Sequence, residues 1–291
     1  MGSKGNEMVE ATGSGGSPGK KSAFWGTKFL IVVTGASGGL GRGIAVSFAE
    51  HVANGSLLVI TGRNTAGLEE TKRMIVSLGR GVSVSVETCD HSRALFRDYE
   101  DLLERASAKL PDPDRVVLVH NAATVESYSD GVVSFDDERK IGDYYRLNLT
   151  SVMTLTAAFL RHYSSDSGPS RVIVNVSSSA GVEAIQGLGL YCTGKAARAM
   201  YMRVVALENP SVTVLRYNPG PVDTAMFGHM QGGSEDCATR YKKALKHGKV
   251  MTPEVTANAL VYILEQQKFK SGDLVDFSPA HINGGSTSGS F

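Results

Sequence analysis

A tyrosine and a lysine stand four residues apart in the segment Y-C-T-G-K, at Tyr191 and Lys195, downstream of a serine run that includes Ser178. On a helix, residues at this spacing lie on one face, one turn apart. A nearby cation favours phenolate, so the tyrosine pKa is expected to fall from ~10 towards working pH, which makes the group a usable general acid or base. The serine hydroxyl would supply a hydrogen-bond donor to a substrate oxygen. These residues indicate a proton-transfer site, although Tyr and Lys at this spacing also occur on ordinary helix surfaces.

A second motif is the glycine cluster T-G-A-S-G-G-L-G, from Thr34 to Gly41, which follows an apolar run and leads into a helical pattern. Glycines permit a tight turn and the close approach of a pyrophosphate to backbone N–H groups, and a helix N-terminus stabilises the negative charge. A glycine cluster alone could be only a flexible turn. In this strand-turn-helix context it predicts dinucleotide binding.

The residues after the second and third expected strands bear on which dinucleotide is bound. About twenty residues past the last glycine, an NAD-preferring site carries an acidic side chain for the ribose 2′-hydroxyl, but this chain has Arg63. A cation there suits a 2′-phosphate and hence NADP(H), although an ordinary solvated arginine is the alternative. Asp90, in T-C-D-H, could receive the adenine amino group or cap the following helix, and His91 beside it is assigned to the same cofactor site.

Two asparagines complete the set of candidates. Asn121 lies in H-N-A-A at the end of the fourth expected strand, where small residues such as Ala122 allow cofactor contact and the asparagine can also tie strands together. Asn148 lies within an otherwise apolar helical pattern. A buried amide needs partners, so Asn148 either bonds to helix backbone or holds a water for proton relay.

The elements that must position these residues are short β-branched runs separated by helical segments. Most runs are continuous rather than alternating, as in strands covered on both faces. We expect strands at Phe29–Thr34, Leu57–Thr61, Val82–Val86, Val116–His120, Val172–Val176, Val212–Leu215 and Leu274–Phe277. We expect helices that include Leu40–His51, Leu68–Leu78, Ala94–Ala108, Tyr144–His162, Ala196–Leu207 and Val255–Gln266. This alternation predicts one α/β domain of the Rossmann type, a doubly wound seven-stranded parallel sheet with helices on both faces.

Composition sets the limits of the domain. Residues 1–27 are rich in Gly and Ser and are predicted to be a disordered leader, residues 28–280 the folded domain, and residues 281–291 a flexible tail. The segment from residue 218 to residue 250 is a predicted lid over the carboxyl ends of the strands. With 291 residues and 42% hydrophobic content, the chain can bury a sizeable core.

The same composition argues against several classes of partner. The formal net charge is +1 and no Lys/Arg run resembles a nucleic-acid footprint, so nucleic acid is not an expected partner. No stretch reaches the ~18 apolar residues of a membrane span, and no export signal is evident, so a soluble protein is expected. The three cysteines, Cys89, Cys192 and Cys237, lack metal-ligand spacing. They predict reduced thiols, a cytoplasmic location and no metal site.

Six motifs in order resemble the short-chain dehydrogenase/reductase family, over residues 28 to about 278. They are T-G-A-S-G-G-L-G, H-N-A-A, Asn148, V-N-V-S-S-S, Y-C-T-G-K and Y-N-P-G-P-V-D-T. The resemblance implies a catalytic tetrad of Asn148, Ser178, Tyr191 and Lys195, with the family's spacing to the tyrosine selecting Ser178 over its serine neighbours. It implies hydride transfer from NADPH to a carbonyl carbon while Tyr191 protonates the oxygen and Ser178 hydrogen-bonds that oxygen. Lys195 would hold the ribose hydroxyls, and Asn148 would retain a water.

The resemblance also implies the cofactor contacts. The Val222 backbone would lie near the nicotinamide carboxamide, and Thr224 near the phosphates. The expected cofactor residues are Gly35, Ser37, Gly39, Leu40, Gly41, Arg42, Arg63, Asp90, His91, Asn121, Ala122, Tyr191, Lys195, Pro219, Gly220, Val222 and Thr224. Association through the helices carrying Asn148 and Tyr191, as a homodimer or homotetramer, is implied as well.

Three segments resemble the branch of the family that reduces side-chain ketones of pterins in tetrahydrobiopterin synthesis. They are L-Y-C-T-G-K-A-A-R, Y-N-P-G-P-V-D-T-A-M and F-K-S-G-D-L-V-D-F. This resemblance implies that Asp276 binds the guanidine-like edge of a pterin through a bidentate charge-assisted contact, although an exposed aspartate ending the last strand is the alternative. The expected substrate residues are Ser178, Ile185, Leu188, Tyr191, Gly220, Met226 and Asp276.

Some positions depart from this branch. Gly38 replaces an arginine common in the glycine turn, which leaves NADP preference to Arg63 and to Arg42. Ile185 and Leu188 stand where bulky aromatics often flank the substrate. The same resemblance extends to reductases of benzil-like diketones, so a broad diketone reductase is an alternative. A non-catalytic NADP-binding sensor or scaffold on the same fold is an alternative of another class.

Overall fold

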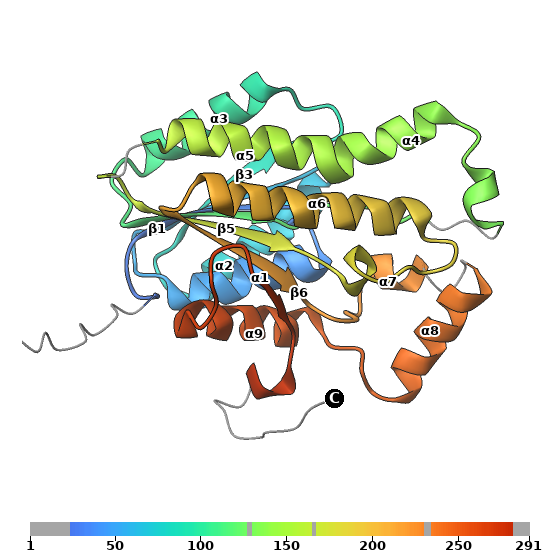
Figure 1. The fold of residues 1–291 in the computed structure, drawn as a ribbon. Helices are drawn as coiled ribbons and strands as arrows, with labels where there is room; N and C mark the ends of the chain where they lie inside the picture. Colours follow the sequence, from blue (N-terminus) through green and yellow to red (C-terminus); the bar gives the residue numbers. More distant parts are fainter. Residues whose placement is uncertain (1–23, 127–129, 165–166, 230–233, 282–291) are drawn as a thin grey trace, which may run out of the picture.

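The described residues form a parallel sheet whose strand order is β3-β2-β1-β4-β5-β6-β7 (Figure 1). The structure is a computed structural model that describes residues 24–126, 130–164, 167–229 and 234–281. The strands are β1 Phe29–Thr34, β2 Leu57–Gly62, β3 Ser83–Thr88, β4 Arg115–His120, β5 Ser170–Val176, β6 Val212–Asn218 and β7 Leu274–Asp276. Every neighbouring pair is parallel, which confirms the predicted doubly wound seven-stranded sheet.

The helices form two layers, one on each face of the sheet. An apolar cluster fills the space between each layer and the sheet, because the continuous apolar strands bury side chains on both faces. One cluster joins the sheet to α1 Gly39–His51, α2 Thr65–Ser77 and α9 Pro253–Gln266. The other joins it to α3 Phe96–Lys109, α5 Ser151–His162 and α6 Gly189–Glu208. None of the helices in the described part of the chain is both long and apolar enough to cross a membrane.

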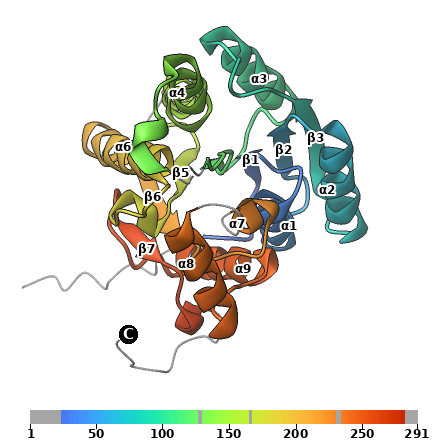
Figure 2. The same cartoon turned by 90° about the vertical axis from the view of Figure 1, so that its right-hand side faces the viewer.

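The carboxyl ends of the strands meet at one edge of the sheet, as parallel pairing requires. Figure 2 views the molecule from the side on which the short helices after β6 lie. These are α7 Ala225–His229 and α8 Glu235–Lys246, and they occupy the described part of the predicted lid. The remaining elements are α4 Glu138–Tyr145 and the short turns η1 Gly131–Ser134, η2 Arg146–Thr150, η3 Ser179–Gly181 and η5 Pro279–His281.

The helix predicted at Tyr144–His162 is divided. Helix α4 already begins at Glu138, where the Asp137 carboxylate accepts hydrogen bonds from two backbone N–H groups of the first turn. A π-helical turn, η2, then joins α4 to α5. The first residues of α4 are polar and exposed, so apolar periodicity could not reveal where the helix starts.

The predicted boundary of the leader at residue 27 is too late. Phe24 and Trp25 are buried, and the Trp25 indole donates a hydrogen bond to the Val261 carbonyl of α9 at 3.1 Å. The Trp25 ring also stacks on Phe29 with centroids 5.3 Å apart. Two large aromatics provide enough apolar area to hold this segment against the core. The predicted leader up to residue 23, and the predicted tail from residue 282, lie outside the described residues.

Candidate active site

A cavity of about 700 Å³ lies at the carboxyl edge of the sheet, beneath α7 and α8. The structure brings nearly all of the predicted site residues into its lining. Those lining it are Gly35, Ser37, Gly39, Leu40, Gly41, Arg63, Asp90, His91, Asn121, Ala122, Ser178, Ile185, Leu188, Tyr191, Lys195, Pro219, Gly220, Val222, Thr224 and Met226. Arg42, Asn148 and Asp276 are not part of it.

The glycine turn after β1 leaves room for a ligand because it is tightly folded. A Cβ at Gly41 would lie 2.2 Å from the Gly35 carbonyl oxygen and 2.5 Å from Nδ2 of Asn121, so no side chain fits there. The Asn121 amide donates to the carbonyls of Thr34 and Gly35, which ties β4 to this turn. No side chain caps the N-terminus of α1. Its free N–H groups therefore fit the pyrophosphate of a dinucleotide.

Of the two arginines considered for a 2′-phosphate, only Arg63 lines the cavity, and its side chain is exposed. The Arg42 guanidinium instead donates to the backbone carbonyls of Ser37 and Gly67, and its Nε donates to the Thr71 hydroxyl. These bonds hold Arg42 between the glycine turn and the first turns of α2. The expectation that Arg42 supports NADP binding by direct contact is thus not met by its position.

Asp90 and His91 differ in what they can offer a ligand. The Asp90 carboxylate accepts from the Ser92 hydroxyl and N–H, and these bonds together with the nearby Arg63 lower the pKa of Asp90. Asp90 thus caps the following turn while it also lines the cavity. The buried His91 ring contacts the hydroxyls of Thr61 and Tyr99 with both nitrogens. Burial lowers the pKa of His91 to about 4, so its ring is neutral near pH 7.

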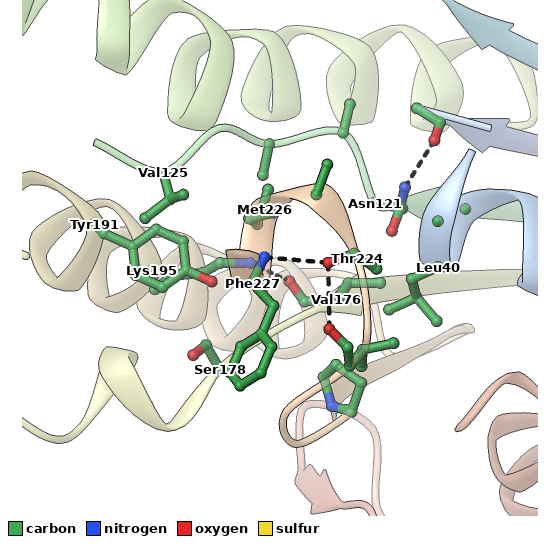
Figure 3. A pocket seen from close by; sticks show the side chains of 18 of the residues that line it. Leu40, Asn121, Val125, Val176, Ser178, Tyr191, Lys195, Thr224, Met226 and Phe227 are labelled. Carbon is green, nitrogen blue, oxygen red and sulfur yellow. Dashed lines mark hydrogen bonds between the residues drawn. The ribbon is translucent and has the colours of Figure 1, made fainter. Parts of the chain in front are cut away.

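Ser178, Tyr191 and Lys195 gather at one end of the cavity (Figure 3). Ser178 follows β5, where its hydroxyl accepts from the Ala180 N–H at 3.2 Å and lies near the Tyr191 hydroxyl. Lys195 lies one helical turn after Tyr191, with its Nζ 5.5 Å from the centre of the tyrosine ring. The ammonium donates to the Val176 carbonyl at 2.9 Å. The spacing read from the sequence thus brings a phenol, a hydroxyl and an amine together.

The electrostatics of this group differ from the sequence-based expectation. Burial raises the pKa of Tyr191, while the nearby Ser178 hydroxyl and the charge of Arg198 act to lower it. Burial also lowers the pKa of Lys195 well below its usual range, and Arg198 adds to that effect. The expected depression of the tyrosine pKa by Lys195 is therefore corrected. Desolvation of Tyr191 outweighs the stabilising effects, and the cation that counteracts it is Arg198.

Asn148 does not line the cavity but is buried within η2. Its Nδ2 donates to the Tyr144 carbonyl at 3.0 Å, and its Oδ1 accepts from the Thr124 N–H at 3.0 Å. The sequence left two roles open for this amide, a bond to backbone groups or the binding of a water. Both of its hydrogen bonds in the structure are to backbone groups. Asn148 therefore fixes the chain that leaves β4 against the helix that precedes α5.

The substrate end of the cavity is mainly apolar. Beside Ile185, Leu188 and Met226 it includes Val125 and Phe227, which sequence reasoning missed. Both are ordinary apolar residues in irregular or short segments, and only the packing of α7 over the strand ends reveals them.

Two charged residues lie near this end. Asp276 is exposed and accepts a 2.8 Å hydrogen bond from the Asn218 amide, and Asn218 itself lines the cavity. The predicted pterin anchor is therefore one residue removed from the lining. Arg240 of α8, also missed from the sequence, does line the cavity and pairs with Glu183 and Asp236.

A family model described as short chain dehydrogenase matches residues 30–233. The chain belongs to the short-chain dehydrogenase/reductase family. It is accordingly an oxidoreductase that acts on carbonyl or alcohol groups. The matched residues span the glycine turn, the Tyr-Lys pair and the first helix of the lid.

Several known proteins resemble this chain over most of its length. Sepiapterin reductase of Rattus norvegicus is 36% identical over 85% of this chain and 95% of the rat protein. The benzil reductase of Bacillus cereus that forms (S)-benzoin is 29% identical over 84% of this chain and 97% of its own. Among solved structures, the KRED1-Pglu enzyme is 27% identical, with a TM-score of 0.72, and covers 86% of this chain and 100% of its own.

Proposed function

We propose that this protein is an NADPH-dependent carbonyl reductase of the sepiapterin reductase type, which reduces side-chain ketones of pterins. The observation that carries the proposal is the arrangement of Tyr191 and Ser178 beside Lys195 in a cavity that continues to the glycine turn. The identity of 36% with a sepiapterin reductase supports the choice of substrate class. The cavity is lined by residues of several family motifs, including the glycine turn and the Tyr-Lys pair, which supports the choice of reaction.

The residues would share the chemistry as follows. NADPH, when bound along the glycine turn, supplies hydride to the carbonyl carbon. Tyr191 donates a proton to the carbonyl oxygen, and its raised pKa keeps the phenol protonated for that purpose. Ser178 donates a hydrogen bond to the same oxygen and stabilises the negative charge that develops there. Lys195, held by the Val176 carbonyl, would contact the ribose hydroxyls.

Asp276 should select pterins if the proposal is right. We expect Asp276→Ala to raise the KM for sepiapterin about tenfold or more, because a charge-assisted contact is lost, while the KM for benzil stays unchanged. Asp273→Ala is the matched control, since Asp273 precedes the same strand at its opposite end and its carboxylate accepts a hydrogen bond from the Lys270 N–H. The measurement is the absorbance of NADPH during reduction of each ketone. Equal losses on both ketones would contradict the role of Asp276.

A broad diketone reductase is the second candidate, and the apolar lining at Val125, Ile185 and Leu188 favours it. Asp276 also lies outside the lining and is linked to it only by its hydrogen bond with Asn218. Among the described residues, no carboxylate lines the substrate end of the cavity. Activity on benzil alone, with sepiapterin inert, would support this candidate. Cofactor binding without reduction of any ketone would instead support a non-catalytic NADP-binding sensor.

Arg63 should determine the preference for NADPH. We expect Arg63→Ala to raise the KM for NADPH about tenfold or more and to leave that for NADH nearly unchanged, because a hydrogen-bonded charge pair contributes about 1.5–3 kcal/mol. Arg73→Ala is the control, because the Arg73 side chain is 73% exposed, pairs with Glu70 on α2 and lies outside the cavity. Steady-state kinetics with both cofactors test this. Equal changes in both KM values would show that Arg63 does not contact a 2′-phosphate.

The proposal extends to assembly and location. Helices α5 and α6 expose apolar side chains, with Met153 42%, Met200 55% and Leu207 82% accessible. We propose that these helices mediate a homodimer or homotetramer. The three cysteines are free thiols, which supports a cytoplasmic protein.

A further inference from the structure

Arg198 is a fully buried arginine without an acidic partner. Its side chain lies on α6, one turn beyond Lys195, and is only 1% exposed. No carboxylate of the described residues lies within ion-pair distance of it. A buried guanidinium usually pairs with an acid, because the loss of hydration is costly. This cation is instead satisfied by uncharged oxygen atoms.

The guanidinium connects the strand ends on either side of the site. Its Nε and Nη2 donate to Oδ1 of Asn175, at 2.9 and 2.8 Å, on β5. Nη2 also donates to the His120 carbonyl at 2.9 Å, and Nη1 to the Ala122 carbonyl at 3.2 Å, at the end of β4. Ala122 lines the cofactor side of the cavity, and the residue after Asn175 accepts the Lys195 ammonium. One side chain therefore holds both strands in register with the catalytic helix.

The titratable groups around Arg198 come from three elements. Tyr191 and Lys195 lie on α6, His120 ends β4, and Tyr144 packs from α4. Burial lowers the pKa of Arg198 to about 10, and the two tyrosines act to raise it, so the group is charged at neutral pH. Its charge in turn lowers the pKa of Tyr191 and of Lys195, and after burial it is the largest cause that lowers the pKa of His120.

We propose that Arg198 is a positioning residue for proton transfer, a fixed buried cation that sets the charge around Tyr191 and Lys195 and holds the ends of β4 and β5 against α6. This inference rests on the proposed function, in which Tyr191 donates the proton. Because its charge has no acid to offset it, the field of Arg198 acts on the phenol and the amine rather than on a partner. Arg198 touches neither reacting atom and works through these two groups.

The test is the pH profile of kcat/KM for ketone reduction at saturating NADPH. Reduction needs protonated Tyr191, so the alkaline limb of the profile reports its pKa. We expect Arg198→Met to move that limb upward by about one pH unit, because the variant lacks the nearby cation that stabilises the phenolate. Arg198→Lys should keep the limb near the wild-type position, although the loss of the fork should raise the KM for NADPH in both variants.

Arg171→Met is the matched control, because Arg171 is a buried arginine at the other end of β5 that donates to the Tyr163 carbonyl and the Ser211 hydroxyl. It should leave the alkaline limb in place. An unmoved limb in Arg198→Met, the same shift in Arg198→Lys, or the same shift in Arg171→Met would each overturn the proposal. If Arg198→Met does not fold, Arg198→Gln replaces it, since the amide keeps a donor but carries no charge.

A second readout does not depend on turnover. The phenolate of Tyr191 is followed by ultraviolet difference titration, as the wild-type signal minus that of Tyr191→Phe. Removal of the Arg198 charge should raise the midpoint by a similar amount, and an unchanged midpoint would refute the inference. If the wild-type protein reduces no ketone, but removal of the Arg198 charge still raises the Tyr191 midpoint, the proposed function is refuted and the effect of Arg198 on Tyr191 stands.

Discussion

Tyr191→Phe is expected to lower kcat for NADPH-dependent ketone reduction by about 10²–10⁴-fold, the usual contribution of a general acid, while the Kd for NADPH stays near the wild-type value. Phenylalanine keeps the ring in its packed position and removes only the hydroxyl that faces Ser178. Stopped-flow reduction and NADPH fluorescence titration measure the two quantities separately.

The matched control for this substitution is Tyr145→Phe. The Tyr145 hydroxyl also hydrogen-bonds to α6, at Thr193 with a separation of 2.6 Å, but Tyr145 lies outside the cavity. We expect its removal to leave kcat unchanged. Retained turnover in Tyr191→Phe, or an equal loss in Tyr145→Phe, would argue that the phenol of Tyr191 is not the proton donor.

Gly41→Ala is expected to lower NADPH affinity by about 100-fold and the free energy of unfolding by about 1–3 kcal/mol, as overpacking does in a tight core. The new methyl would lie 2.2 Å from the Gly35 carbonyl, so the turn that faces the cofactor must move. Fluorescence titration with NADPH gives the affinity, and thermal or urea unfolding gives the stability.

Gly38→Ala provides the control within the same turn. Its backbone is extended, with φ of 177°, and a Cβ there would meet nothing within 4 Å. We expect nearly unchanged stability. Similar losses in the two alanine variants would mean that the turn tolerates no side chain anywhere, and that the close contact at Gly41 is not the cause.

The sheet could be predicted from the sequence because each strand is a continuous apolar run that packs on both faces. The glycine turn and the Tyr-Lys pair could be predicted because spacing along the chain fixes their geometry. The hydrogen-bond partners of Arg42 and Asp276 could not be predicted. Each side chain is held by a backbone carbonyl or an amide group from another element of the fold. Arg198 reads as a polar residue on a helix, and only the strand ends folded against α6 make it buried.

The same limit explains the boundaries that sequence reasoning missed. The first residues of α4 are polar, so the apolar pattern does not show where this helix starts. The Asp137 side chain caps its N-terminus. Phe24 and Trp25 follow a Gly- and Ser-rich segment whose composition suggested disorder. Their rings are nevertheless buried in the core cluster that includes α9.

That contact couples the two ends of the domain. Trp25 bonds to α9 near the C-terminus through Val261, and the Arg115 guanidinium lies 4.2 Å from the centre of the Phe24 ring, at the start of the central strand β4. The last helix also packs closely along α1. Terminal segments of most domains fray independently, with opening free energies near zero. Here the first aromatic residues cannot separate without uncovering α9, so both ends of the domain should open together and exchange their amide hydrogens as one cooperative unit.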